Sequence, residues 1–112
     1  MAKHNKDGQV AEDIATRYLE DQGYKILDRN WKTKFCEIDI VASKNGVVHF
    51  VEVKYRSSDK YGSGFDYITP SKLRQMGFSA QLWVSRQRYE GEYVLSAIQI
   101  NQKLQVDFIE EI

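Results

Sequence analysis

Two short runs of strand-forming residues, joined by an Asn-Gly pair, most constrain what this chain can fold into. The runs are Cys36–Ala42 (CEIDIVA) and Val47–Arg56 (VVHFVEVKYR), and Asn45-Gly46 lies between them. β-Branched and aromatic residues favour a pleated, half-buried strand. Asn and Gly both tolerate the positive φ of a type I′ turn. The pattern therefore predicts an antiparallel β-hairpin.

The length of this turn determines which charged side chains face one another. With a two-residue turn, Asp39 lies opposite Glu52 and Glu37 lies opposite Lys54, all on one face of the hairpin. Cys36, Ile38, Ile40 and Ala42 are expected to share the other face. A four-residue loop would instead place Glu37 opposite Glu52. A three-residue loop with a bulge would break the alignment.

Asp39 and Glu52 would bring two negative charges to one point of the sheet, between apolar neighbours. Opposed residues have Cβ atoms roughly 4.5–5.5 Å apart, and like charges there are destabilising. Either one carboxyl is protonated at a raised pKa, or a divalent cation neutralises both. Mg²⁺ takes one or two protein carboxylates and completes its shell with water and phosphate oxygens. With the Lys54 ammonium on the same face, such a site could hydrolyse a phosphodiester.

The same charges also suit the solvent-facing side of an antiparallel sheet, where charged side chains belong. On that interpretation Glu37 and Lys54 form a cross-strand salt bridge, and no ion is needed. The residues alone leave both interpretations open.

The rest of the chain predicts two helices and further strands. Apolar residues at helical spacing, followed by Gly23 at the C′ position, indicate a first helix. Thr69-Pro70 supplies the N-cap and first residue of a second helix, which we expect Gly91 to end. The expected elements are a helix at about Asp7–Asp21, strands at Tyr24–Arg29, Cys36–Ala42 and Val47–Arg56, a loop at Ser57–Thr69, a helix at about Pro70–Arg88, and strands at Glu92–Ile100 and Lys103–Ile109. This order, α-β-β-β-α-β-β, predicts an α/β sandwich with a mixed central sheet flanked by helices.

Length and composition limit the classes of protein that are possible. A chain of 112 residues that is 42% hydrophobic allows one domain, residues 1–112, with a real core, and excludes a barrel enzyme of about 250 residues. The single cysteine excludes an internal disulfide and is compatible with a cytoplasmic location. The sequence contains neither the apolar segment of a signal peptide nor a membrane span, so we expect no membrane partner.

Charge is distributed unevenly, although the formal net charge is zero. Residues 54–88 contain seven basic and two acidic residues, whereas residues 89–112 contain one basic and five acidic residues. A basic middle segment suits contact with a polyanion on one side of the protein. Ordinary solvated faces that differ in charge explain it equally well.

The order of these charged residues also carries a family resemblance. Asp39 followed by Glu52-Val53-Lys54 resembles the D…(D/E)XK signature of the restriction-endonuclease-like PD-(D/E)XK nucleases. The segments Glu37–Ala42 and Phe50–Lys54 look like the YraN family, a bacterial family of largely uncharacterised proteins similar in fold to archaeal Holliday junction resolvases. The further matches run over nearly the whole chain and comprise Gly8, Ala11, Glu12, Ala15, Tyr18, Leu19, Gly23, Tyr24, Arg29, Asn30, Arg56 and Lys72.

This resemblance implies a restriction-endonuclease-like fold and a set of site residues. Asp39 and Glu52 would bind Mg²⁺ or Mn²⁺, and Lys54 would be the catalytic lysine. Glu12 matches the position of an additional acidic residue in junction resolvases. Its place at the edge of the apolar stripe would let its carboxylate reach over the sheet, whereas Asp13 is expected to point to solvent. Stabilisation of the helix dipole is the alternative role for Glu12.

Two basic residues are candidates for phosphate contacts. Lys72, in the first turn of the second helix, would hold a phosphate beside the backbone N–H groups of the helix start. Arg56 lies on the same strand face as Lys54. The alternatives are a surface lysine that covers apolar side chains and, for Arg56, a salt bridge at the sheet edge.

Two positions depart from the family pattern. Cys36 stands where the family usually has glycine, which would narrow the approach to the metal and place a thiol beside it. Ile38 replaces the proline of the signature and is expected to be harmless. His49 alternates to the opposite face from Glu52, so we expect a packed or surface histidine rather than a ligand.

Together these expectations describe a Mg²⁺-dependent endonuclease that acts on DNA, including branched or junction structures. A nucleic-acid binding module with a vestigial, non-cleaving site would share the fold and need no metal. A third interpretation is an interaction protein whose carboxylates hold a structural ion or a partner's basic surface. Junction resolvases act as dimers, so the resemblance also implies a homodimer.

Overall fold

The computed structural model describes residues 6–57 and 64–112, with side chains from Gly8 onward. Part of the expected loop, residues 58–63, and the first five residues lie outside the described residues. The elements are α1 (Lys6–Asp21), β1 (Lys25–Lys32), β2 (Glu37–Lys44), β3 (Val47–Arg56), α2 (Pro70–Gln87), β4 (Glu92–Asn101) and β5 (Val106–Ile109). The order predicted from the sequence is therefore confirmed.

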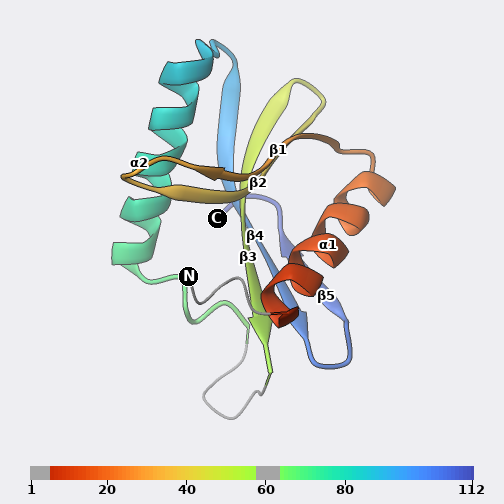
Figure 1. Cartoon of the computed structure of the whole chain (residues 1–112). Helices are drawn as coiled ribbons and strands as arrows, with labels where there is room; N and C mark the ends of the chain where they lie inside the picture. Colours follow the sequence, from red (N-terminus) through yellow and green to blue (C-terminus); the bar gives the residue numbers. More distant parts are fainter. Residues whose placement is uncertain (1–5, 58–63) are drawn as a thin grey trace.

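The five strands form one mixed sheet in the order β1-β2-β3-β4-β5. Neighbouring strands are antiparallel except for β3 and β4, which are parallel and are connected through α2. The two helices lie on opposite sides of the sheet (Figure 1). The molecule therefore has three layers, with the sheet in the middle.

Each helix covers its own cluster of buried side chains, and β3 contributes to both. Val51 and its neighbour Ile40 belong to the α1 cluster, whereas Phe50 packs beside Trp83 in the α2 cluster. Their ring centroids are 5.4 Å apart in an edge-to-face arrangement. Successive side chains of a strand point to opposite faces, so the expected alternation of β3 is confirmed. None of the helices in residues 6–57 and 64–112 combines the length and apolar character needed to cross a membrane.

The hairpin turn has the predicted two-residue geometry. Asn45 and Gly46 have φ values of 53° and 79°, the positive values that a type I′ turn requires. Pairing then runs from Lys44–Val47 to Ile40–Val51. The register expected from a two-residue turn is confirmed over these residues.

The C-terminal end of α1 and the N-terminal end of α2 have the predicted caps, whereas α2 ends differently from the prediction. Gly23 has a φ of 92°, and Tyr24 N–H donates to Leu19 O at 2.9 Å, which is the expected C-terminal cap of α1. Thr69 Oγ1 accepts a hydrogen bond from Lys72 N–H, as expected for an N-cap. The expectation that Gly91 ends the second helix is wrong. The turn to the left-handed conformation comes earlier, at Arg88, with a φ of 55°.

The last strand is shorter than expected because a turn occupies its predicted beginning. Asn101 Oδ1 accepts hydrogen bonds from the N–H groups of Lys103 and Gln105. Leu104 takes a positive φ of 63° within this turn. The ladder between β4 and β5 therefore begins only at Val106.

Two glycines allow a matched test of the turn. We expect Gly46→Ala to lower the free energy of unfolding by roughly 1–2 kcal/mol, because an L-residue is strained at positive φ while no atom lies within 4 Å of the added Cβ. Gly77→Ala, which also meets nothing within 4 Å but lies inside α2, should raise it by roughly 0.8–1.0 kcal/mol. Urea unfolding measures both values. Equal effects of the two substitutions would contradict the turn assignment.

Candidate functional site

The site predicted from the sequence lies where β2 and β3 part. The last pair of their ladder is Ile40–Val51. Asp39 immediately precedes Ile40 in β2. Its side chain, rather than the main chain, binds β3 here: Asp39 Oδ2 accepts a hydrogen bond from Val53 N–H at 2.8 Å. Asp39 and Glu52 lie just beyond the end of the ladder and line one pocket, but they do not form the directly opposed ladder pair that the turn predicted.

Asp39 is half-buried, and its carboxyl is strongly perturbed. Burial and the nearby Glu52 carboxylate raise the pKa of Asp39 to about 7, with smaller contributions from Glu12 and Glu37, while the hydrogen bond from Val53 N–H acts in the opposite direction. Near neutral pH this group is thus divided between its acid and its carboxylate.

Glu52 has a cationic partner from α2. Lys72 Nζ lies 2.9 Å from Glu52 Oε2, and both side chains are largely covered. The two residues share a pocket of about 160 Å³ between the sheet and the first turns of α2. Its lining comprises Cys36, Glu37, Asp39, Glu52, Lys72, Gln75, Met76 and Ser79. Lys72 therefore reaches the predicted site, and Cys36 is among the residues that line its pocket.

Glu12 reaches the other side of the same site. Its side chain is buried, and its Oε1 accepts hydrogen bonds from Arg29 Nη2 at 2.9 Å, Arg29 Nε at 3.2 Å and Asn30 Nδ2 at 2.8 Å. A second pocket, of about 90 Å³, contains Glu12, Asn30 and Asp39. Asp39 thus lines the pockets on both sides of the sheet, and Glu12 lies over the sheet as predicted.

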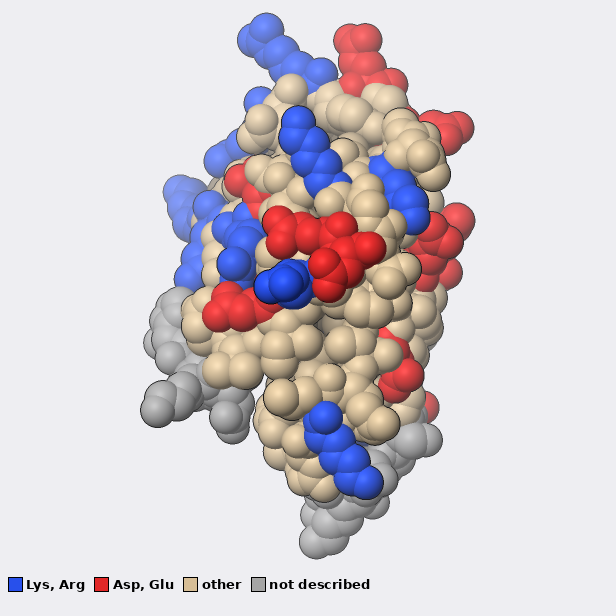
Figure 2. Space-filling view, turned by 90° about the vertical axis from the view of Figure 1, so that its right-hand side faces the viewer, with Lys and Arg blue, Asp and Glu red and all other residues tan. Residues whose placement is uncertain are grey.

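Asp13 is exposed, as expected, but it also has a partner in β1. Its Oδ1 lies 2.6 Å from Arg29 Nη2, although the side chain is more than half exposed. The hydrogen bond from Arg29 holds the pKa of Asp13 below its ordinary value. Arg29 therefore joins the two adjacent acids of α1 to the sheet. On the α1 side of the molecule, acidic and basic side chains lie side by side rather than in one field of either sign (Figure 2).

The expected alternation along β2 is broken at Asp39. Ile38 and Ile40 were predicted to share a face, but Ile38 packs in the α2 cluster and Ile40 in the α1 cluster. Glu37 is paired with Lys32 of β1 rather than set opposite Lys54. Each change follows from the separation of β2 from β3, because a strand that has left one neighbour can twist independently of it.

The predicted catalytic lysine lies beside an aromatic ring. Lys54 is exposed on β3, and its Nζ lies 5.7 Å from the centroid of the Tyr67 ring, within the range of a cation–π contact. Arg56 is further along the same strand and half-buried. Tyr67 belongs to the irregular segment before α2, where no periodicity could have singled it out.

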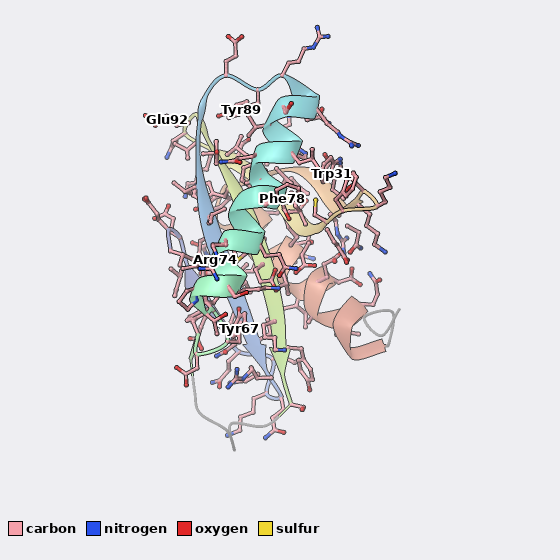
Figure 3. The ribbon with its side chains drawn as sticks, turned by 90° about the vertical axis from the view of Figure 1, so that its left-hand side faces the viewer. Trp31, Tyr67, Arg74, Phe78, Tyr89 and Glu92 are labelled. Atoms are coloured by element: carbon pink, nitrogen blue, oxygen red, sulfur yellow. The ribbon has the colours of Figure 1, made fainter. Side chains whose placement is uncertain are left out.

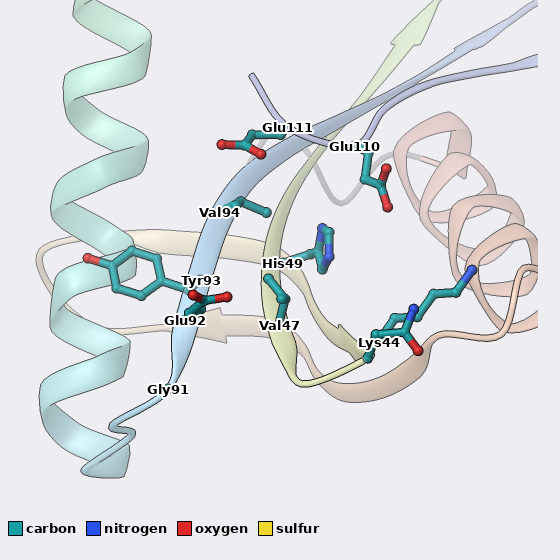
Figure 4. A pocket seen from close by; sticks show the side chains of 10 residues that line it. Lys44, Val47, His49, Gly91, Glu92, Tyr93, Val94, Glu110 and Glu111 are labelled. Carbon is teal, nitrogen blue, oxygen red and sulfur yellow. The ribbon is translucent and has the colours of Figure 1, made fainter.

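A larger pocket lies elsewhere. It has a volume of about 690 Å³ and lies at the beginning of β3 and β4 (Figure 4). Two of its polar side chains already have partners: His49 Nδ1 lies 3.0 Å from Ser96 Oγ, and Glu110 Oε2 accepts a hydrogen bond from the Tyr24 hydroxyl. Burial holds the pKa of His49 below its ordinary value. His49 is the packed histidine that the sequence predicted.

The carboxylates suit a hard cation, although they do not enclose one. Among residues 6–57 and 64–112, no three His, Cys, Asp or Glu side chains are arranged to hold a metal ion. An ion between Asp39 and Glu52 would therefore take most of its ligands from water or phosphate, which is the usual habit of Mg²⁺. Such an ion would also remove the repulsion that raises the pKa of Asp39.

Fold and site together define a class: a small α/β protein with a five-stranded mixed sheet that carries a carboxylate cluster where two strands separate. The chain belongs to the uncharacterised protein family UPF0102, whose model matches residues 11–110. The resemblance to the YraN family is thereby confirmed.

Several bacterial proteins are similar to this chain in sequence. A UPF0102 protein of Wolinella succinogenes is 42% identical over 108 residues, which cover 94% of each chain. A UPF0102 protein of Vibrio parahaemolyticus is 43% identical over 81 residues, covering 72% of this chain and 67% of the relative. One from Flavobacterium johnsoniae is 47% identical over 74 residues, covering 66% of this chain and 60% of the relative.

The raised pKa of Asp39 makes stability depend on pH. Folded Asp39 holds its proton up to about pH 7, whereas the unfolded group releases it near 3.8. Its contribution to stability is therefore complete at low pH and is lost as the pH rises from about 4 to 7. We expect Asp39→Asn, which keeps an acceptor for Val53 N–H, to be more stable than the natural protein at pH 8 by on the order of 2 kcal/mol. Urea unfolding at pH 4 and pH 8 measures this, and a difference independent of pH would contradict it.

Proposed function

We propose that this protein is a metal-dependent endonuclease that hydrolyses phosphodiester bonds in DNA, with branched or junction structures among its substrates. The observation that carries the proposal is the Asp39 carboxyl, whose pKa burial and Glu52 raise to about 7 at the end of the β2–β3 ladder. A pair of carboxylates that repel one another in a partly dry site is suited to share a cation.

The residues around this pair have separate roles in the proposal. Asp39 and Glu52 would hold Mg²⁺ or Mn²⁺, which when bound would lower the pKa of a water molecule and neutralise charge on the phosphate. Lys54 would orient the attacking water or offset the charge that develops on the phosphate oxygens. Glu12 would support the position of Asp39 from the α1 side, since both line one pocket.

Two basic residues would hold the substrate. Lys72 lies beside Glu52 in the first turn of α2, where backbone N–H groups and a cation together suit a phosphate. Arg56 would contact a phosphate further along the strand face of Lys54. In the absence of substrate, Lys72 neutralises Glu52, so phosphate would compete with Glu52 for the Lys72 ammonium.

The restriction-endonuclease-like assignment is part of this proposal. Its support is the D…EXK pattern of Asp39, Glu52 and Lys54 together with the order of elements, an antiparallel β1-β2-β3 meander followed by α2 and the parallel β4. A homodimer would present two such sites to the paired strands of a junction.

Cleavage is tested with labelled single-stranded, duplex, flap and four-way-junction DNA in Mg²⁺ or Mn²⁺. We expect the natural protein to cut at least one structure and Asp39→Ala to lose about 100-fold or more of that rate, because it loses a metal ligand. Asp21→Ala is the matched control, since Asp21 is an exposed acid paired with Arg17 on the surface of α1. Failure of the natural protein to cut any of these substrates with either metal would contradict the proposal.

A nucleic-acid binding module with a non-cleaving site is the second candidate. It is favoured by the 2.9 Å contact between Lys72 and Glu52, which neutralises Glu52 without an ion. This candidate predicts that DNA binding is unchanged by EDTA and that Asp39→Ala binds as well as the natural protein or better, with no cleavage by either. Gel-shift titration over a salt series measures the binding, because a phosphate interface loses affinity steeply as salt rises.

A further inference from the structure

Among the described residues, the buried polar atoms without a hydrogen-bond partner include one from the segment before α2 and one from β4. They are the hydroxyl of Tyr67 and Oε1 of Gln99. The Gln99 side chain is only 7% exposed. A buried polar group without a partner costs roughly 1–3 kcal/mol, so native proteins rarely keep one without a reason.

Both groups belong to the immediate surroundings of Lys54. Gln99 is the neighbour of Lys54 in the parallel β3–β4 ladder, and paired residues of a sheet project from the same face. Tyr67 lies on that face as well, with Lys54 Nζ 5.7 Å from its ring centroid. Figure 3 shows Tyr67 below the first turn of α2, over the lower part of the sheet.

The Tyr67 hydroxyl is also close to the carboxylates of the candidate site. Its pKa is raised, first by burial and then by the charges of Glu52 and Asp39, while Arg56 acts in the opposite direction. The phenol therefore keeps its proton at every physiological pH. A neutral phenol beside a lysine is a donor suited to an anionic oxygen.

We propose that Tyr67 and Gln99 form, beside Lys54, a subsite for one phosphate of a nucleic-acid backbone, next to the phosphate that Asp39 and Glu52 would receive. The Tyr67 hydroxyl donates to a non-bridging oxygen of this phosphate, and its ring holds Lys54 in place. At the floor of the subsite, Gln99 Oε1, which can only accept a hydrogen bond, would receive the ammonium of its ladder neighbour Lys54. This inference rests on the proposed function, because it names residues that bind the substrate of that site.

Tyr67→Phe separates this role from a structural one, because it removes the hydroxyl and keeps the ring under Lys54. We measure binding of a fluorescein-labelled DNA duplex by anisotropy in EDTA, so that neither metal nor cleavage contributes. We expect Tyr67→Phe to bind about tenfold more weakly, as for a lost hydrogen bond to a charged group. The dependence of affinity on salt should stay the same, since no charge is removed. Gln99→Met, of similar length, should also weaken binding without changing the salt dependence.

Tyr24→Phe is the matched control. The Tyr24 hydroxyl donates to Glu110 Oε2 at 3.0 Å, on the α1 side of the sheet. Its removal should lower the midpoint of urea unfolding and leave DNA affinity unchanged. For Tyr67→Phe the midpoint should be unchanged or higher, because the lost hydroxyl has no protein partner.

The outcomes separate the subsite from the function on which it rests. If the natural protein binds DNA and Tyr67→Phe binds equally well, the subsite is wrong and the proposed function stands. If Tyr67→Phe weakens binding only in proportion to a lowered unfolding midpoint, the hydroxyl is structural and the subsite is again wrong. If the natural protein has no affinity for DNA, the proposed function fails and the subsite with it.

Discussion

The separation of β2 from β3 at Asp39 is the constraint on which the rest of the site depends. The turn at Asn45 and Gly46 sets a register that runs without interruption to Ile40–Val51. Beyond that pair, the Asp39 side chain accepts the Val53 N–H. A side chain that takes a main-chain hydrogen bond is held in position by the fold itself. The carboxyl is therefore kept near Glu52 despite their repulsion.

Polar groups near Asp39 are compensated to different degrees on the two sides of the sheet. On the α1 side, Glu12 is buried but has three donated hydrogen bonds, from Arg29 and Asn30, so its charge is compensated by the protein. On the α2 side, Lys72 reaches Glu52 through one ion pair, and Tyr67 and Gln99 have polar atoms without partners. A group compensated within the protein supports structure, whereas an uncompensated one has capacity left for a ligand. Substrate would thus approach from the α2 side.

Local signals predicted the elements well, and tertiary contacts explain what was missed. Asn-Gly, Gly23 and Thr69-Pro70 act through their own backbone geometry, so the turn and both caps were correct. Ile38 was assigned to the wrong face because strict alternation assumes a strand with neighbours on both sides. The contact between Asp13 and Arg29 was missed because its partners come from α1 and β1. No sequence periodicity marked Tyr67, because its position follows from packing of an irregular segment against β3.

The features that mark the site also lower stability, and this links fold to function. The raised pKa of Asp39 and the unpartnered groups of Tyr67 and Gln99 each cost free energy in the isolated protein. A chain shaped for stability alone would have apolar residues at these positions. Asp39 lines the pocket beside Glu52, and Tyr67 and Gln99 lie next to Lys54. His49 and Glu110, which have hydrogen-bond partners, line the larger pocket at the other end of β3. The arrangement therefore favours the region around Asp39, Glu52 and Lys54 over the larger pocket as the proposed place for a phosphate and a cation.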